Sequence, residues 1–202
     1  MRSLITAFTA FILMFTSSAY AERQTPDEVR VFVEKLGEKV IKAINDNSND
    51  FQARQNAFEN IFRDNANVPK IARFVAGKAW RSSDDVTKSD YIDAYRSYMA
   101  FTYAARINNF DDQMLEVGRV KDIGRAGFLV KTNIISNNSV QPPVVLTWQL
   151  SDKDNALKVT DLKVENISMS LTQRSEFSSI LAKNNNDLAK LTDILKKRTI
   201  RE

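Results

Sequence analysis

Apolar residues recur at helical spacing in the segment that follows Thr25, and the residues around Thr25 form a helix start signal. Thr25 is a favourable N-cap, Pro26 suits the first helical turn, and Glu28 completes a capping box. The apolar positions after it are Val29, Phe32, Val33, Leu36, Val40, Ile41 and Ile44. This spacing predicts an amphipathic helix of about 20 residues, and the polar run 45–50 ends it.

Three more helices are predicted before residue 109. One begins near Phe51, and a short one opens at Pro69 and stops near Gly77. The longest follows a cap at Ser82, with Asp85 three residues later. One face of it carries Tyr91, Tyr95, Tyr98 and Thr102, which we call the aromatic stripe after its three tyrosines. The helical part of the chain is therefore expected to span residues 26–108.

Beyond residue 112 the apolar period changes from 3.6 to 2, which is typical of strands. Strand-like stretches cover 114–120, 128–135, 144–150 and 157–171, and they are separated by turn-like segments at 123–127, 137–139 and 152–155. We expect a sheet over 112–171. Helical spacing returns in two segments within 173–198. Helices followed by strands and then by helices predict an α+β fold with an antiparallel sheet.

The first 21 residues have the three parts of a secretory signal peptide. Arg2 precedes an apolar run from Leu4 to Phe15, and small residues follow up to Ala21, where we expect cleavage. A retained membrane anchor is the alternative, but a spanning helix needs about 20 apolar residues. Removal of 21 from 202 residues leaves 181, enough for one domain over 22–202. The protein is therefore expected to be exported.

Charge and composition exclude several function classes. One of the 29 basic side chains, Arg2, lies in the leader, so 28 basic side chains oppose 25 acidic ones and the net charge is +3. Because the signs are interspersed, a nucleic-acid partner is not expected. The chain has neither cysteine nor histidine, which rules out Ser-His-Asp and Cys-His catalysis and thiolate or imidazole metal sites.

Two carboxylate pairs remain as candidates for acid/base chemistry. They are Asp84-Asp85, in a helix cap, and Asp111-Asp112, in the turn before the first strand, and both positions favour acids for local reasons. The glycines form no nucleotide fingerprint. An enzyme is therefore not expected, and no cofactor or metal is implied.

The aromatic stripe has two possible interpretations. Such a stripe is usually ordinary core. Together with Phe74, Trp80, Met99 and Trp148, it could instead line an apolar cavity between a helix and a curved sheet. Periodicity alone does not decide between these interpretations.

The order of several segments resembles the MlaC family, also called the toluene-tolerance auxiliary family of periplasmic phospholipid-binding proteins. The segments are 68–81 (VPKIARFVAGKAWR), Tyr91-x3-Tyr95-x2-Tyr98-x3-Thr102, Val159-x-Asp161, 164–171 (VENISMSL) and 174–177 (RSEF). Three positions depart from the family pattern. Asn166 replaces a usual Gly, Leu157 lies near a usual Trp, and Asn184-Asn-Asn186 replaces a glycine-rich turn.

The resemblance implies a twisted antiparallel sheet of the nuclear-transport-factor-2-like kind, a helical subdomain, and an apolar pocket between them that holds acyl chains. It also implies a periplasmic carrier that exchanges phospholipid with an inner-membrane ABC transporter complex bearing substrate-binding domains and with an outer-membrane lipoprotein complex, and so maintains outer-membrane lipid asymmetry.

Candidate pocket residues come from both lines of reasoning. By the resemblance, Val144 and Ile167 match pocket-lining sites, and Lys88 matches a basic position on the head-group side. Periodicity adds Phe74, Val75, Tyr95, Tyr98, Met99, Leu146, Trp148, Val164 and Met169. Two alternatives keep the fold. One is a carrier of a polycyclic lipid such as a hopanoid, suggested by Asn166 and Leu157, and the other is a small enzyme that uses Asp161 and Tyr98.

Overall fold

The computed structural model describes residues 23–106, 113–136, 142–153 and 156–200. The expected leader with its cleavage site and the Asp111-Asp112 pair lie outside these residues. The helices are α1 (Pro26–Asp46), α2 (Phe51–Asn65), α3 (Val68–Ala76), α4 (Lys78–Ser82), α5 (Asp85–Arg106), α6 (Met169–Lys183) and α7 (Leu188–Arg198), with a short 3-10 turn η1 (Gly124–Ala126). The strands are β1 (Gln113–Asp122), β2 (Phe128–Ser136), β3 (Val144–Ser151), β4 (Lys158–Val164) and β5 (Ile167–Ser168).

The five strands form one antiparallel sheet in the order β1-β2-β3-β4-β5. Each strand pairs with its neighbour in the chain, as hairpin connections require. The register shifts between Val117 and Val120 of β1, where the pairing with β2 is irregular. The predicted α+β class with an antiparallel sheet is confirmed.

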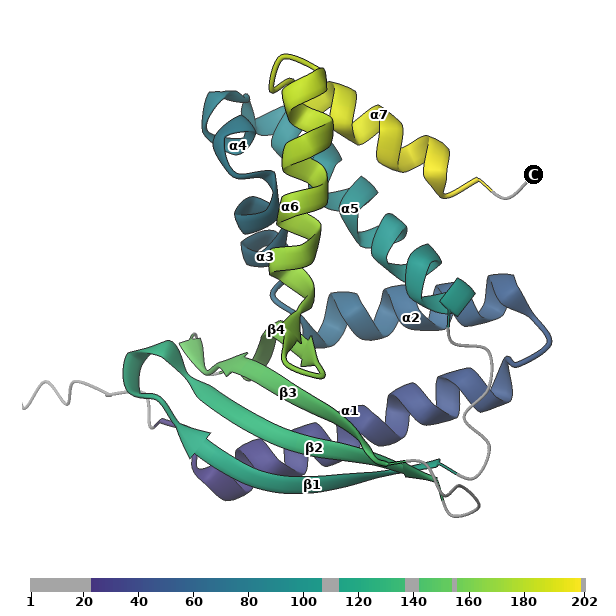
Figure 1. Cartoon of the computed structure of the whole chain (residues 1–202), viewed down its shortest axis with the longest axis vertical. Helices are drawn as coiled ribbons and strands as arrows, with labels where there is room; N and C mark the ends of the chain where they lie inside the picture. The colour runs from purple at the N-terminus through teal and green to yellow at the C-terminus, as the bar shows by residue number, and fades with distance from the viewer. Residues whose placement is uncertain (1–22, 107–112, 137–141, 154–155, 201–202) are drawn as a thin grey trace, which may run out of the picture.

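Helix α1 covers one face of the sheet, and the other helices form a second body above it (Figure 1). The predicted capping box is present: the Thr25 hydroxyl accepts from the Glu28 N–H, and the Glu28 carboxylate accepts from the Thr25 N–H. Arg30 donates to the carbonyl of Val117 at 2.8 Å and so ties α1 to β1. The core between α1 and the sheet contains Val29, Val33, Leu36, Phe128, Val130, Leu146, Trp148 and Leu150.

A separate core fills the helical body. Its largest fully buried side chains are Tyr91 and Tyr95 of α5, Phe177 of α6, and Leu188, Leu191 and Leu195 of α7. The rings of Tyr95 and Phe177 meet edge to face at 6.2 Å, which is a favourable aromatic geometry. Half of the predicted aromatic stripe is therefore the centre of this second core.

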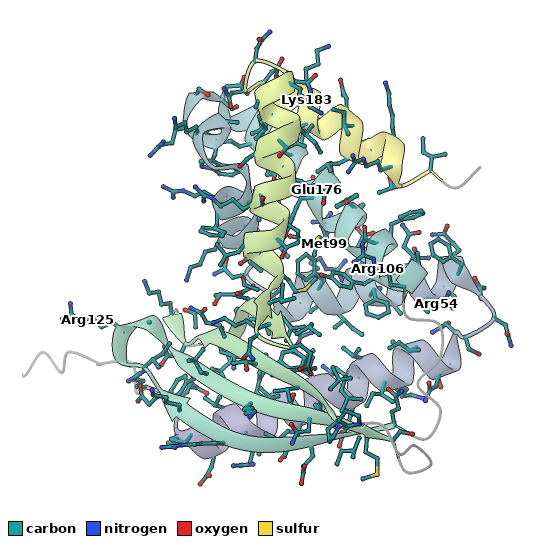
Figure 2. The ribbon with its side chains drawn as sticks, viewed as in Figure 1. Arg54, Met99, Arg106, Arg125, Glu176 and Lys183 are labelled. Atoms are coloured by element: carbon teal, nitrogen blue, oxygen red, sulfur yellow. The ribbon has the colours of Figure 1, made fainter. Side chains whose placement is uncertain are left out.

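Arg54 joins three elements at the far end of the helical body from α6 (Figure 2). Its guanidinium donates to the carbonyls of Ala104, Asn47 and Ser48, each at 2.8 Å, although the residue is only 6% exposed. Carbonyls at helix ends lack backbone donors, so a buried cation satisfies them well. This side chain fixes the end of α5 against the α1–α2 turn.

The predicted strand over 157–171 is wrong in its last part. Ser168 ends β5 and caps α6, which begins at Met169 and not at residue 173. The Asp161 carboxylate accepts from the Ser168 hydroxyl at 2.6 Å and from the Ser170 N–H at 3.0 Å. The second bond satisfies a first-turn N–H of α6, and the first holds the Ser168 cap in place, so both favour an early helix start. Within the described ranges, no helix is both long and apolar enough to traverse a bilayer.

Candidate functional site

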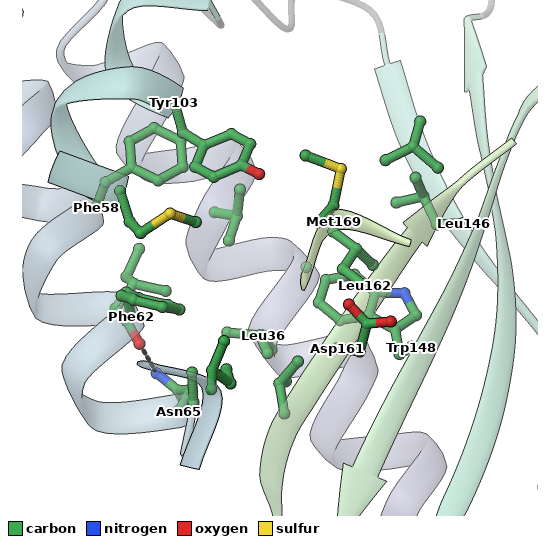
Figure 3. A pocket seen from close by; sticks show the side chains of 18 of the residues that line it. Leu36, Phe58, Phe62, Asn65, Tyr103, Leu146, Trp148, Asp161, Leu162 and Met169 are labelled. Carbon is green, nitrogen blue, oxygen red and sulfur yellow. Dashed lines mark hydrogen bonds between the residues drawn. The ribbon is translucent and has the colours of Figure 1, made fainter. Parts of the chain in front are cut away.

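A cavity of about 350 Å³ lies where the two cores meet (Figure 3). It is lined by Leu36, Leu146 and Trp148 of the core between α1 and the sheet, and by Ile71 and Met99 of the helical core. The two cores touch at Val159, which packs against both. The cavity is therefore the part of this boundary that side chains leave unfilled.

The helices supply about half of the wall through residues at helical spacing. Residues 58, 61, 62 and 65 of α2 form one stripe, and residues 36, 37, 40 and 41 of α1 form another. Gly37 allows α1 to lie close to β1, because a Cβ on it would be 2.2 Å from the Cδ2 of Leu115. The helical wall consists of Leu36, Gly37, Val40, Ile41, Phe58, Ile61, Phe62, Asn65, Ala66, Ile71, Tyr95, Met99, Ala100 and Tyr103.

Strand alternation places the opposite wall on one face of the sheet. Leu146 pairs with Val164, and Trp148 pairs with Leu162, so these four side chains form a continuous apolar surface. The sheet and the start of α6 contribute Leu115, Ile134, Val144, Leu146, Trp148, Val159, Asp161, Leu162, Val164, Met169, Ser170 and Gln173. Val144, at the start of β3, is the wall residue with the highest exposure among the large apolar ones, at 41%.

Most polar groups in the wall are already hydrogen-bonded within the protein. Gln173 accepts from the Tyr95 hydroxyl at 2.5 Å and donates to the Met99 sulfur at 2.7 Å. Asn65 donates to the backbone of Ile61, and Asp161 accepts from Ser168 and Ser170 as described above. The Trp148 N–H donates to Thr132. Satisfied polar groups offer little to a polar ligand, so the wall is chemically apolar.

Tyr103 is different, because its hydroxyl points into the cavity toward Met169 (Figure 3) and forms no hydrogen bond with a described residue. Burial raises the pKa of Tyr103 to about 12, and burial also raises the pKa of Tyr95. Both phenols are therefore neutral near pH 7 and cannot act as bases there. Tyr103 remains a hydrogen-bond donor for a ligand atom.

Seven of the predicted pocket residues line this cavity, and they come from three parts of the chain. Their proximity in the structure does not by itself test a role in ligand binding, which stays a prediction. They are Tyr95, Met99, Val144, Leu146, Trp148, Val164 and Met169.

Four predicted pocket residues lie elsewhere. Val75 is fully buried in the helical core, and Tyr98 packs its ring on Phe177 at 5.8 Å. Phe74 is 40% exposed on the outer side of α3, and Ile167 is 63% exposed after the β4–β5 turn. The sequence shows that these side chains are apolar or aromatic, but it does not show whether each one faces the cavity, the helical core or solvent.

Lys88 also lies apart from the cavity. It is seven residues before Tyr95, or about 10 Å along the helix axis. Its ammonium group pairs with Asp85 at 3.0 Å and lies 5.8 Å from the Trp80 ring centroid. These contacts give it a local role at the start of α5.

The pocket residues predicted from the sequence include none from α1 or α2, although both helices line the cavity. Their apolar stripes were visible, but a stripe that faces a cavity has the same spacing as one that faces a packed core. Asp161 and Tyr98 do not form an acid/base pair, since only Asp161 lines the cavity. No group of three or more carboxylates that could hold a metal occurs among the residues that the structure describes.

Comparison with solved structures identifies a similar fold. A phospholipid-binding protein from Ralstonia solanacearum, solved in complex with a phospholipid, matches with a TM-score of 0.70 at 16% sequence identity. The match covers 84% of this chain and 96% of that chain. This likeness shows that the fold is shared.

Sequence comparisons lead to the same group. The intermembrane phospholipid transport system binding protein MlaC of Haemophilus influenzae is 23% identical over 167 residues, which cover 80% of this chain and 75% of that protein. The family model described as MlaC protein matches residues 34–197, most of the chain. The chain therefore belongs to the MlaC family.

Proposed function

We propose that this protein is a phospholipid carrier that holds acyl chains in the cavity between its two cores. The observation that carries the proposal is the wall itself: it is formed almost entirely by apolar side chains, and its polar groups are bonded internally. The names of the Haemophilus relative and of the Ralstonia neighbour support the same ligand class.

The energetics of such a carrier require no catalytic residue. Each methylene that leaves water for an apolar site gains about 0.8 kcal/mol. A lipid tail in the cavity therefore avoids most of the cost of an aqueous crossing. The head group would remain near solvent, in line with the exposure of Val144 at one end of the wall.

The cellular setting belongs to the same proposal. The leader over residues 1–21 would direct the chain to the periplasm and be cleaved after Ala21. There the carrier would exchange lipid with an inner-membrane ABC transporter complex with substrate-binding domains and an outer-membrane lipoprotein complex, and thereby maintain outer-membrane asymmetry. The name of the Haemophilus relative supports a role in lipid transport between membranes.

Neither alternative gains support from the cavity. Asn166 and Leu157, which suggested a polycyclic lipid, are both absent from its wall. An enzyme would need a free acid/base pair, whereas the Asp161 carboxylate already accepts two hydrogen bonds. We therefore favour acyl-chain binding over both.

Lipid content is the direct test. The mature protein, purified from cells that export it, should release phospholipid into an organic extract, detected by mass spectrometry. Substitution Val164→Trp should block the cavity and reduce the bound lipid. Lys163→Trp is the matched control, because Lys163 is the adjacent residue of β4 and does not line the cavity.

The two variants distinguish the possible results. Loss of lipid in Val164→Trp alone, with the fold retained by circular dichroism, supports the proposal. A protein that carries no lipid after export, and takes none from liposomes, contradicts it. A polycyclic lipid in the extract would instead support the hopanoid-type alternative.

A further inference from the structure

Three exposed apolar side chains gather on the outer side of α3 and the start of α6, away from the cavity. Phe74 is 40% exposed, Leu171 58% and Ile167 63%. Phe74 and α6 are joined by Arg174, whose guanidinium lies 4.6 Å from the Phe74 ring centroid and donates to the Phe74 carbonyl at 2.5 Å. We call this surface the α3/α6 face.

Helical geometry puts Leu171 beside this contact. It precedes Arg174 by three residues, so both side chains lie on the same flank of α6. Ile167 is in β5, directly before the helix. Met169, between Ile167 and Leu171, lines the cavity. The α3/α6 face is therefore the outside of a segment whose inner side is cavity wall.

The segment that carries Phe74 is also strongly basic. Residues 66–83 contain no acidic side chain but contain the exposed Lys70, Arg73, Lys78 and Arg81. With Arg174 these make five cations, and none of them forms an ion pair with a described residue, whereas Lys88, Arg96, Lys196 and Arg198 all do. The local charge is thus far higher than the interspersed charges of the whole chain imply.

Unpaired cations around exposed apolar tips are the arrangement of proteins that rest on anionic membranes. The cations meet lipid phosphates, and the apolar side chains enter the boundary between head groups and acyl chains. Stacking on Arg174 holds the Phe74 ring outward, so little side-chain entropy is lost on docking. An acidic protein surface would satisfy the cations but not the three separate apolar tips.

We propose that the α3/α6 face docks the protein on the surface of an anionic phospholipid bilayer. This docking goes beyond cargo binding, and it brings the cavity wall formed by Met169 close to the bilayer. It requires no partner protein. It also does not depend on whether the cavity holds lipid.

Vesicle sedimentation tests the proposal with the full mature chain. The protein should bind vesicles that contain phosphatidylglycerol, should not bind pure phosphatidylcholine vesicles, and should be released by high salt. The double variant Lys70→Glu/Arg73→Glu should bind at least about 20-fold more weakly, since each cation near an anionic surface contributes about fivefold. Circular dichroism and thermal unfolding should show that the variant still folds.

The control is Lys121→Glu/Lys131→Glu, which changes the net charge equally at two exposed positions on the sheet. Its vesicle binding should stay within about twofold of wild type, because only cations close to the anionic membrane surface contribute to the electrostatic attraction. Phe74→Ser/Leu171→Ser should weaken the binding that persists at moderate salt. The proposal is overturned if the wild-type protein does not bind anionic vesicles at low ionic strength. It is also overturned if both charge variants lose vesicle binding equally, or if the serine variant binds as well as wild type.

Discussion

Ala100 and Ala104 lie one turn apart on α5, and replacing each with phenylalanine should shift stability in opposite directions in lipid-free protein. Both residues are buried, at 2% and 0% exposure. Ala100 lines the cavity, whereas Ala104 does not. The two positions share a helix and a residue type, so the space beside them is the main difference.

The magnitude follows from that space. At Ala100 the new ring enters the cavity of about 350 Å³, and burial of a phenylalanine side chain contributes about 1.5 to 3 kcal/mol. The lower helix propensity of phenylalanine costs about 0.5 kcal/mol. The expected net gain is about 1 to 2.5 kcal/mol, or roughly 2 to 10 °C in Tm for a chain of this size. At Ala104 overpacking should cost about 1 to 3 kcal/mol.

The assay is thermal unfolding of delipidated protein, followed by far-ultraviolet circular dichroism, together with uptake of a fluorescent phospholipid. Ala100→Phe should melt higher than wild type yet take up less lipid, because the ring occupies the space of an acyl chain. Wild type should gain stability when lipid is restored, and Ala100→Phe should gain less. If Ala100→Phe lowers Tm as much as Ala104→Phe does, the cavity is not open in the lipid-free protein and this reasoning is refuted.

Three further substitutions test other contacts. Arg54→Met leaves the buried Ala104 carbonyl and the part-buried carbonyls of Asn47 and Ser48 without this donor and should lower the free energy of unfolding by about 1 to 3 kcal/mol in urea titrations; a neutral result would contradict its clamping role. Asp161→Asn should cost about 1 to 2 kcal/mol by weakening the bonds to Ser168 and Ser170, with unchanged lipid uptake; lost uptake would give Asp161 a direct role. Hydrogen bonds from Thr25 lower the pKa of Glu28, so the stability that this carboxylate adds is present above its ordinary pKa and is lost as pH falls through the folded-state value. Glu28→Gln should therefore lose less stability on acidification than wild type. If the urea midpoints of the two proteins fall by the same amount from neutral to acidic pH, the prediction is contradicted.

Local signals predicted the elements well because their causes are local. The capping box before α1 consists of residues three apart, and it forms as expected. The start of α6 was missed because its cause is distant in the chain. Asp161 of β4 bonds Ser168 and Ser170 and turns an apparent strand end into a helix start.

The cavity was only half predictable for the same reason. Strand alternation placed Leu146, Trp148 and Val164 on one face, and all three line it. Phe74 and Ile167 have equally apolar side chains but lie outside. Which way such a residue faces depends on how two separate cores dock, and no sequence window contains that information.

Two of the three departures from the family pattern, Asn166 and the 184–186 turn, have a backbone explanation that bears on ligand choice. Asn166, Asn185 and Asn186 have φ values of 66°, 54° and 56°, which lie in the left-handed region that glycine tolerates best. Asparagine is among the few other residues found there often. Asparagine at these turns therefore preserves the backbone that glycine would adopt, and none of the three lines the cavity. The asparagine departures therefore give no physical reason to expect a ligand other than the one that the family's usual sequence would bind, and Tyr103 is the wall position whose polar atom a ligand could meet.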